Sequence, residues 1–352
     1  MNINYCRVSW FLHRLRHRRR PTIEEIADST WELCEAKAER IPAAICLDGA
    51  LEQIRAFSPW TTRDYEMPRV LGGIIEHAAS KAHLIRSANI FGAYIYKGAY
   101  KSKHGYGTEV LSDSSTEAFR HLTSACLVSN IAGSSFFGNF LLDELPLALI
   151  PKGDNIPFVA RTKYYGHEAG YRELLSLPKP DEISNARVHN LTVYTDFAQN
   201  SYKRERYIEL RRRLAANFEH RGKSDGRRIY LKRGSTGESR ILTNEAQLEV
   251  VLDRLGYDIV EPEKLTAHEI SERMFGASLV VSVEGSHISH AIYSMSEDAA
   301  ILVIQPPYRF ATPYKEFTDC MGMRFGFVVG QPESDGFSVN MDDLQRLADK
   351  LD

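Results

Sequence analysis

Polar side chains end an apolar, β-branched run in the stretch LVVSVEGSHISH, residues 279–290. Residues 279–283 predict a buried strand, and a second apolar segment begins at Ile288. The strand is followed directly by Glu284, Gly285, Ser286 and His287. Ligands of open parallel sheets lie beyond the carboxyl ends of the strands, where the start of a helix offers N–H groups to phosphate. The stretch therefore predicts a ligand-binding turn.

The residue types of this turn suit a phosphorylated ligand. Gly285 lets the backbone approach closely, and Ser286 could cap the helix or contact a phosphate oxygen. Glu284 could accept hydrogen bonds from ribose or sugar hydroxyls. An ordinary strand-to-helix turn with a Gly-Ser cap explains the same residues. His287 and His290 share a helix face without an evident third ligand, so we expect a buried imidazole or a phosphate contact and no metal.

A second candidate site is RRIYLKRGSTGESRILTNE, residues 227–245. A predicted strand delivers Lys232 and Arg233 to a Gly-Ser-Thr-Gly turn, and Arg240 precedes the next helix. Together with Gly285 at the same sheet edge, these cations could clamp a diphosphate, and arginine offers bidentate contacts that lysine does not. The spacing is neither a P-loop nor the G-x-G-x-x-G dinucleotide motif. A surface loop with solvated charges is the alternative interpretation.

A third candidate is LLDELP, residues 141–146, in the first turns of a helix predicted to follow a Gly-Asn turn within residues 137–152. Asp143 or Glu144 could act as a general base if it faced a cleft. Compensation of the helix dipole is the more common reason for acids in this position.

The elements that would position these residues follow a regular pattern in the second half of the chain. Strands are predicted at 191–195, 227–233, 257–265, 279–283 and 299–306, and helices at 204–218, 243–256, 266–278 and 341–350. This alternation predicts an α/β fold with a parallel sheet. Residues 21–56 predict helix, 87–97 and 156–163 predict strands, and the polar, proline-containing stretch 177–189 predicts a linker. We expect a basic leader plus helix (1–56), an N-terminal domain (57–182), a C-terminal domain (183–335) and a terminal helix (336–352).

The composition of the chain argues against several classes of function. The 352 residues carry a formal net charge of −2, so no global field favours nucleic acid. Five scattered cysteines without CxxC spacing fit a reducing compartment and argue against a zinc site. The stretch VSWFLHRLRHRRR, residues 8–20, mixes apolar residues with five arginines and is not a signal peptide. It predicts either a basic amphipathic contact with an anionic membrane surface or a solvated leader, and the sequence slightly favours the leader.

In order and spacing, four segments resemble glycosyltransferase family 61. They are NFLLDELP (139–146), RRIYLKR with SRILTNE (227–245), GYDIVEPEKL (256–265) and SVEGSHISH (282–290). The resemblance implies a GT-B-like architecture, with two Rossmann-like domains facing each other across a cleft and the donor bound mainly by the C-terminal one. It implies inverting transfer of a hexosyl or pentosyl group from a nucleotide-sugar to a glycan or lipid-linked acceptor, without a metal or other cofactor.

In that scheme Arg233 and Arg240, with Lys232 nearby, neutralise the leaving diphosphate. The turn from Glu284 to His287 holds the donor, and Asp143 is the base. The sequence departs from the family pattern at Asn139, where histidine is usual, which makes Glu144 a second candidate base.

The resemblance further implies a bacterial enzyme of capsule, exopolysaccharide or lipopolysaccharide assembly, cytoplasmic or peripheral on the inner membrane face. A sugar-nucleotide-modifying enzyme, such as an epimerase, and a non-catalytic scaffold are the alternatives.

Overall fold

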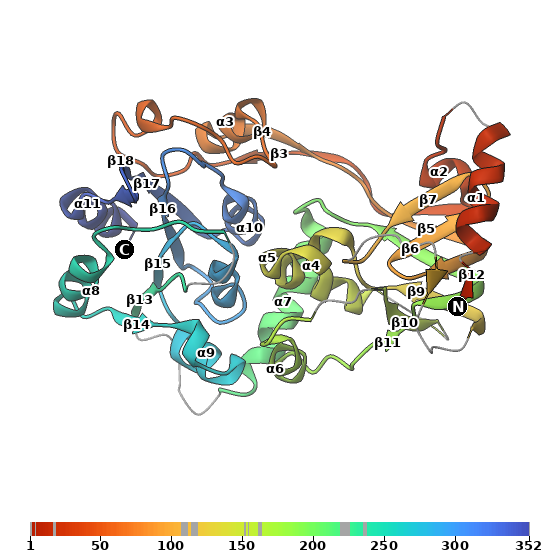
Figure 1. The fold of residues 1–352 in the computed structure, drawn as a ribbon. Coiled ribbons are helices and arrows are strands. Elements are labelled where there is room, and N and C mark those ends of the chain that lie inside the picture. Colours follow the sequence, from red (N-terminus) through yellow and green to blue (C-terminus); the bar gives the residue numbers. More distant parts are fainter. Residues whose placement is uncertain are drawn as a thin grey trace. The chain divides into compact units, whose positions relative to one another are not determined.

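The computed structural model describes residues 2–3, 5–16, 19–106, 112–113, 119–150, 153, 155–160, 164–218, 226–234 and 238–351. Its elements are labelled in Figure 1. The chain forms two compact units, each assembled from several segments. Unit 1 comprises Met1–Ala36, Ala78–Arg172 and Leu177–Ala198, and unit 2 comprises Lys37–His77, Glu173–Ser176 and Gln199–Asp352. The predicted α/β class is confirmed. The domain boundaries predicted from the sequence remain a prediction.

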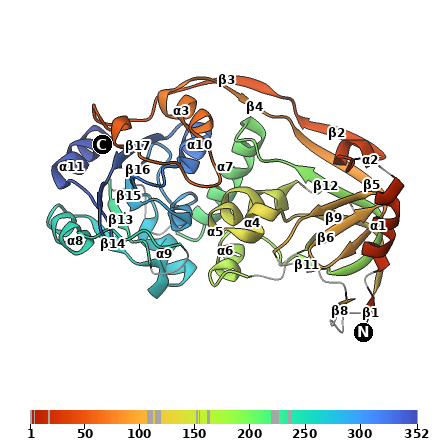
Figure 2. The same ribbon diagram turned by 45° about the horizontal axis from the view of Figure 1, so that its top comes forward.

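Unit 1 is built on an eight-stranded mixed sheet of order β11-β10-β9-β12-β5-β6-β7, with β2 also paired to β5. Strands β11, β10, β9 and β12 run parallel, and the others are antiparallel to their neighbours. Figure 2 shows this sheet with β5, β6, β9 and β12 side by side. The strands are β2 (Ser29–Cys34), β5 (Ser80–Phe91), β6 (Tyr94–Lys97), β7 (Tyr100–Lys103), β9 (Arg120–Leu127), β10 (Ile156–Val159), β11 (Asp181–Glu182) and β12 (Asn185–Thr195).

The helices of unit 1 include a run of short, irregular turns. They are α1 (Tyr5–Arg16), α2 (Ile23–Ile26), α4 (Ile131–Ser135), α5 (Phe137–Asn139), a π-helix η2 (Phe140–Glu144), a 3-10 helix η3 (Leu145–Leu149) and α6 (Glu168–Leu174), of which Glu173 and Leu174 belong to unit 2. Strands β1 (Asn2–Ile3) and β8 (Ser112–Asp113) form a separate antiparallel pair.

Two predictions for this half of the chain are wrong. The helix expected over 21–56 ends after α2, because the next segments find strand partners: β2 pairs with β5, and β3 (Lys37–Ile41) pairs with β4 (Gly73–His77). Asp28 marks the change, since its carboxylate accepts the Arg86 N–H at 2.8 Å. The linker expected over 177–189 contains β11 and the start of β12, in which Ala186 and Val188 are fully buried.

Unit 2 contains a five-stranded, all-parallel sheet of order β14-β13-β15-β16-β17. The strands are β13 (Arg228–Leu231), β14 (Asp258–Val260), β15 (Leu279–Val283), β16 (Ala300–Gln305) and β17 (Arg324–Val329). The helices are α3 (Arg63–Leu71), α7 (Ser201–Ala215), α8 (Glu245–Arg254), α9 (Ala267–Met274), α10 (Pro313–Met321) and α11 (Met341–Leu351), with 3-10 turns η1 (Leu51–Gln53), η5 (Pro262–Lys264) and η6 (Ser286–Ala291). A hairpin of β18 (Gln331–Glu333) and β19 (Gly336–Ser338) precedes α11. Most strands and helices predicted for this half are confirmed in place, with small shifts at their ends. Of the strand predicted over 257–265, only Asp258–Val260 forms a strand, and Pro262 begins the 3-10 turn η5.

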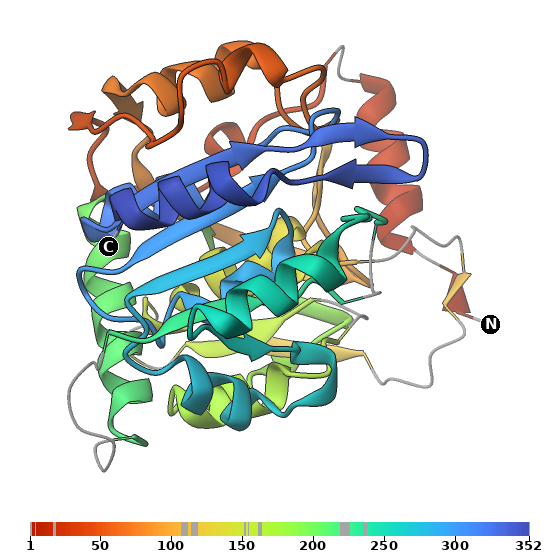
Figure 3. The ribbon, with the colours of Figure 1, turned by 90° about the vertical axis from the view of Figure 1, so that its left-hand side faces the viewer.

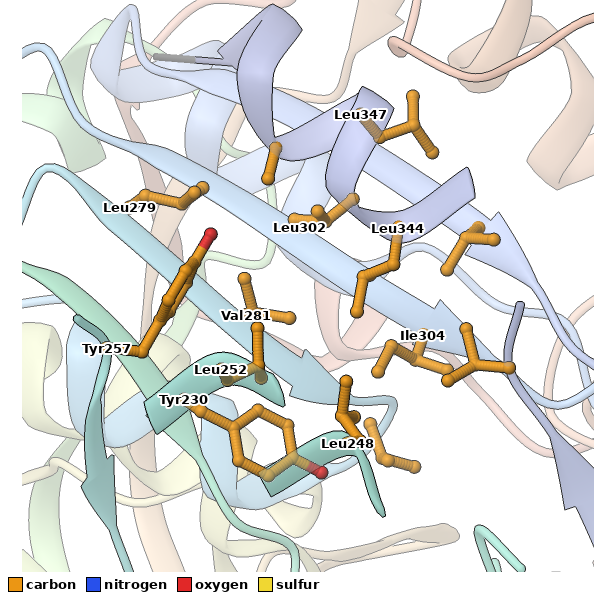
Figure 4. Close-up of a cluster of buried hydrophobic side chains, with 14 of the residues drawn as sticks. Tyr230, Leu248, Leu252, Tyr257, Leu279, Val281, Leu302, Ile304, Leu344 and Leu347 are labelled. Carbon is orange, nitrogen blue, oxygen red and sulfur yellow. The ribbon is translucent and has the colours of Figure 1, made fainter. Parts of the chain in front are cut away.

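Helices α8 and α11 cover one face of the parallel sheet (Figure 3). Figure 4 shows the contact, in which leucines of the two helices pack on every second residue of the strands. The buried cluster includes Leu248, Leu252, Leu344, Leu347, Val281, Leu302 and Ile304. Fully burying each such side chain stabilises the fold by about 1.5–3 kcal/mol, which makes this sheet a rigid base for the turns at its carboxyl edge. Among the described residues, no helix is long and apolar enough to cross a membrane.

Candidate functional site

The carboxyl ends of β13 and β15 bring two predicted site residues together in unit 2. The strands are parallel neighbours with Leu231 aligned to Ser282, so the residues just beyond them meet at one edge. There the Arg233 guanidinium Nη1 donates to the Glu284 carbonyl oxygen at 3.2 Å. Burial, with a smaller effect of the neighbouring Arg240, lowers the pKa of Arg233 to about 10, so the side chain stays charged at neutral pH.

Arg240 and Glu284 form an ion pair in the same place. Arg240 Nε lies 2.6 Å from Glu284 Oε2, and the two side chains are 8% and 6% exposed. Burial raises the pKa of the Glu284 carboxyl, and the nearby arginines oppose that shift. Within the described residues, neither Arg240 Nε nor Glu284 Oε2 has a hydrogen-bond partner, so the contact between them is an ion pair without hydrogen-bond geometry.

Gly285 is required where it stands because Arg233 occupies the space of a side chain. A Cβ atom at position 285 would lie 1.8 Å from Arg233 Nη1 and 2.9 Å from His287 Nδ1. The glycine therefore allows the guanidinium to lie directly against the turn. The Gly285 carbonyl accepts a hydrogen bond from the buried Tyr314 hydroxyl at 3.1 Å, which fixes the turn from its other side.

Arg309 is a member of the cluster that our sequence analysis missed. It follows β16, the next parallel strand, and its side chain is 18% exposed. Arg309 forms an ion pair with Glu238, whose carbonyl also accepts a hydrogen bond of 2.6 Å from Arg233 Nη2. Three arginines thus face two glutamates. The position just beyond a neighbouring parallel strand is the signal that could have pointed to Arg309.

His287 is neutral in this surrounding. Burial first, and then the charges of Arg233 and Arg240, lower its pKa to about 3, although the residue keeps part of its surface exposed. The Ser282 hydroxyl donates to the Leu231 carbonyl at 2.7 Å and lies 2.6 Å from His287 Nε2. Since the hydroxyl proton is used in the first bond, His287 Nε2–H is the donor in the second, and Nδ1 is left as an acceptor.

The other predicted residues of this region have different surroundings. Lys232 Nζ is paired with Glu249 Oε1 on α8 at 2.8 Å. Ser286 begins the six-residue η6, a shorter and tighter turn than the helix we expected, and its carbonyl accepts the Ser289 hydroxyl at 2.6 Å. Residues 235–237 of the predicted turn lie outside the described residues.

Asn244 and Glu245 anchor the end of the loop that carries Arg240. The Asn244 amide donates to the Val339 carbonyl at 2.8 Å and its oxygen accepts the Val339 N–H at 3.1 Å. Glu245 accepts the hydroxyl of Tyr230 at 2.8 Å. These bonds join the start of α8 to β13 and to the segment before α11, so they hold the loop that carries Arg240.

The two candidate carboxylates lie in unit 1, on the single turn of π-helix η2. Asp143 is 5% exposed, and its Oδ2 accepts the Asn139 amide N–H at 2.7 Å. The Asp143 carbonyl accepts from Asn130, the N-cap of α4, at 3.3 Å. A π-turn is a rare local structure that often occurs at functional sites. It holds the Asp143 carboxylate in a fixed direction through a neutral partner.

Glu144 is enclosed in the interior of the same unit. It is 1% exposed, with Oε1 4.0 Å from Arg172 Nη2. A Cβ atom on Gly133 would lie 2.6 Å from Glu144 Cβ, so α4 passes directly against this side chain. Arg172 also donates to Glu168 at 3.0 Å, which makes the group a buried ionic network. Within the described part of the chain, no three His, Cys, Asp or Glu side chains gather where they could hold a metal ion.

A comparison with known protein families indicates the class of protein to which part of the chain is similar. Residues 137–302 match the family model described as Glycosyltransferase 61, a segment that includes the π-turn of unit 1 and the Arg233, Arg240 and Glu284 cluster of unit 2. This segment is therefore similar to glycosyltransferases. The matched segment belongs to glycosyltransferase family 61, which confirms the resemblance found in the sequence. A comparison with curated proteins found no match.

Proposed function

We propose that this protein is a glycosyltransferase that moves a hexosyl or pentosyl group from a nucleotide-sugar to a hydroxyl of a glycan or lipid-linked acceptor, with inversion and without a bound metal ion. The observation that carries the proposal is the cluster of Arg233, Arg240 and Arg309 at the carboxyl edge of the parallel sheet. Charge develops on the leaving diphosphate as the glycosidic bond breaks. Positioned guanidinium groups stabilise such charge and bind phosphate oxygens in bidentate pairs.

Glu284 has a supporting part in this proposal. Its carboxylate holds Arg240 through Nε, and its carbonyl holds Arg233 through Nη1. Both arginines are thus fixed before the ligand arrives, so little reorganisation is needed when charge develops. Lys232 is left out of the proposed diphosphate site because its ammonium group is paired with Glu249. Ser286 and the neutral His287 remain candidates for contacts with the donor.

Asp143 is the proposed base. It takes the proton of the acceptor hydroxyl while the acceptor oxygen bonds to the anomeric carbon, and the bond from that carbon to the diphosphate breaks with its electron pair leaving on the phosphate. Asn139 supports this assignment because its amide orients the carboxylate without competing for the proton. Glu144, in its ionic network with Arg172, is assigned a positioning part instead.

The proposal includes a GT-B arrangement in which unit 2 binds the donor and unit 1 supplies the base. It also places the reaction in the bacterial assembly of a surface polysaccharide, at the cytoplasmic side of a membrane. The separate sheet and core of each unit support the first part, and the family of the matched segment supports the second.

The test is release of nucleoside diphosphate from a panel of nucleotide-sugars, with and without an acceptor glycan fraction. We expect release that depends on the acceptor, a product of inverted anomeric configuration by NMR, and loss of turnover in Asp143→Asn. Asp181→Asn, an exposed carboxylate of the same unit, is the matched control. Conversion of the donor sugar without any acceptor would favour a sugar-nucleotide-modifying enzyme. Absence of both turnover and nucleotide binding would favour a scaffold, and full turnover in Asp143→Asn would remove the base assignment.

A further inference from the structure

Helix α1 presents an exposed apolar stripe that the proposed transfer reaction does not use. Its large side chains are Tyr5, Val8, Phe11, Leu12 and Leu15, which are 74%, 47%, 55%, 59% and 69% exposed. Steps of three and four residues place all five on one face of an α-helix. Contiguous apolar surface of this kind on a protein marks an interaction site.

The opposite face of α1 is fixed to unit 1. The Trp10 Nε1–H donates to the Ala99 carbonyl at 2.9 Å, and the Lys101 ammonium lies 4.7 Å from the centre of the indole ring. Figure 2 shows α1 beside β5 and β6, against which it packs. Because Trp10 holds the helix from within, the stripe faces outward and does not turn into the core.

The chemistry around the stripe is strongly basic. The helix sequence YCRVSWFLHRLR contains Arg7, Arg14 and Arg16 and no acid. Arg19 and Arg20 follow, and the Arg20 guanidinium lies 5.9 Å from the Trp10 ring. Arg19 pairs with Glu25, so part of this charge is neutralised. The helix and the residues that follow it are thus rich in arginine, in a chain whose formal net charge is −2.

We propose that α1 lies flat on an anionic phospholipid surface, with the apolar stripe among the outer acyl carbons and the arginines at the headgroup phosphates. An amphipathic helix with aromatic and leucine residues on one face and arginines beside it binds such surfaces. A second copy of the chain is a less suitable partner for the stripe. If two α1 helices packed against each other through their stripes, their arginines would lie close together with no acidic residue of α1 to compensate the charge. The surface would also bring the enzyme to a lipid-linked acceptor, but this inference stands without the transfer reaction.

The experiment is co-sedimentation of the full chain with vesicles of phosphatidylcholine alone or of phosphatidylcholine with about one third phosphatidylglycerol. We expect at least tenfold stronger binding to the anionic vesicles, and weaker binding when the salt concentration rises from about 0.1 M to 0.5 M. The variant Phe11→Ser, Leu12→Ser, Leu15→Ser should lose at least tenfold of the affinity. A second variant, Arg7→Gln, Arg14→Gln, Arg16→Gln, should lose the preference for anionic lipid.

The matched control is Ile208→Ser with Val250→Ser, two exposed aliphatic residues on α7 and α8. It should bind vesicles like the wild type. Circular dichroism reports whether each variant is folded, and the substituted side chains of the first variant all come from the exposed face. Equal sedimentation of the wild type and the stripe variant would overturn the proposal. So would a monomer–dimer change in the stripe variant that occurs without any vesicle binding, because the occupant would then be a second copy.

Discussion

Substituting Gly285 with alanine would put a methyl group where the Arg233 guanidinium now lies. The new Cβ atom would be 1.8 Å from Arg233 Nη1, well inside contact distance. Since the clash is with the end of a long side chain, the arginine moves and loses its hydrogen bonds to the carbonyls of Glu284 and Glu238. It then no longer stands where the diphosphate is proposed to bind.

The size of the effect follows from the lost contact. A hydrogen bond to a charged group contributes about 1.5–3 kcal/mol, so Gly285→Ala should weaken binding of the preferred nucleoside diphosphate by about tenfold to about a hundredfold. Isothermal titration calorimetry measures this in wild type and in Gly285→Ala. The same pair is then measured in an Arg233→Ala background, in which the methyl group displaces no guanidinium.

The double-mutant comparison isolates the mechanism. Any backbone cost of alanine at position 285 is shared by both backgrounds and cancels. We expect Gly285→Ala to change the affinity by no more than about twofold once Arg233 is absent. An equal loss in both backgrounds would refute the reasoning, because the glycine would then act without Arg233.

Three further predictions concern four side chains, two of which are compared with each other. Asp143→Asn should abolish turnover in the donor assay and leave nucleoside diphosphate affinity unchanged. Glu144→Gln should instead lower the free energy of unfolding in urea by about 3–5 kcal/mol, because it breaks a buried ionic contact with Arg172. The reverse pattern would exchange the two roles. The pKa of His287 is lowered to about 3 in the folded protein, whereas the pKa of a histidine in the unfolded chain is about 6.5. As the pH falls below about 6.5, the unfolded chain takes up a proton that the folded protein does not. The free energy of unfolding therefore decreases by about 1.4 kcal/mol per pH unit. Urea unfolding at pH 7.5 and 5.0 should therefore show a smaller loss for His287→Gln than for the wild type, and equal losses would contradict the assignment. Lys232→Ala should leave diphosphate affinity within about twofold and cost at most about 1 kcal/mol of stability, since its ion pair is partly exposed; a large loss of affinity would return it to the site.

The second half of the chain could be predicted from its sequence because local signals and long-range structure agree there. Each strand is a short apolar run, and the helices carry their own caps, such as the capping box in which Thr266 and Glu269 bond each other's backbone N–H groups. Parallel strands then bring Arg233 and Glu284 to one edge without further information. That is why two motifs whose residues lie 51 positions apart could be joined from the strand pattern alone.

The first half could not be predicted in the same way because its partners are distant. Residues 29–34 have helical spacing but become β2, since β5 offers antiparallel backbone partners, with one register shift between Glu32 and Cys34. The π-turn at Asp143 depends on the packing of α4 against η2, which no local pattern encodes. In the candidate site, the sequence indicated arginines and a glutamate, and it did not reveal that Glu284 would bind Arg240 or that Arg309 would join them.

The central claim is that the arginine cluster of unit 2 binds the diphosphate of a nucleotide-sugar. The most direct measurement is calorimetric titration of UDP, GDP and ADP, with CMP as a monophosphate control, into wild type, Arg240→Ala and Arg346→Ala, with chelator present. Arg346 is the control because it is an exposed arginine of the same unit, on α11. We predict that one diphosphate binds wild type and Arg346→Ala alike and binds Arg240→Ala at least tenfold more weakly, the scale of one charge-assisted contact. Binding that is equal in all three proteins, or no binding of any diphosphate to wild type, would contradict the account.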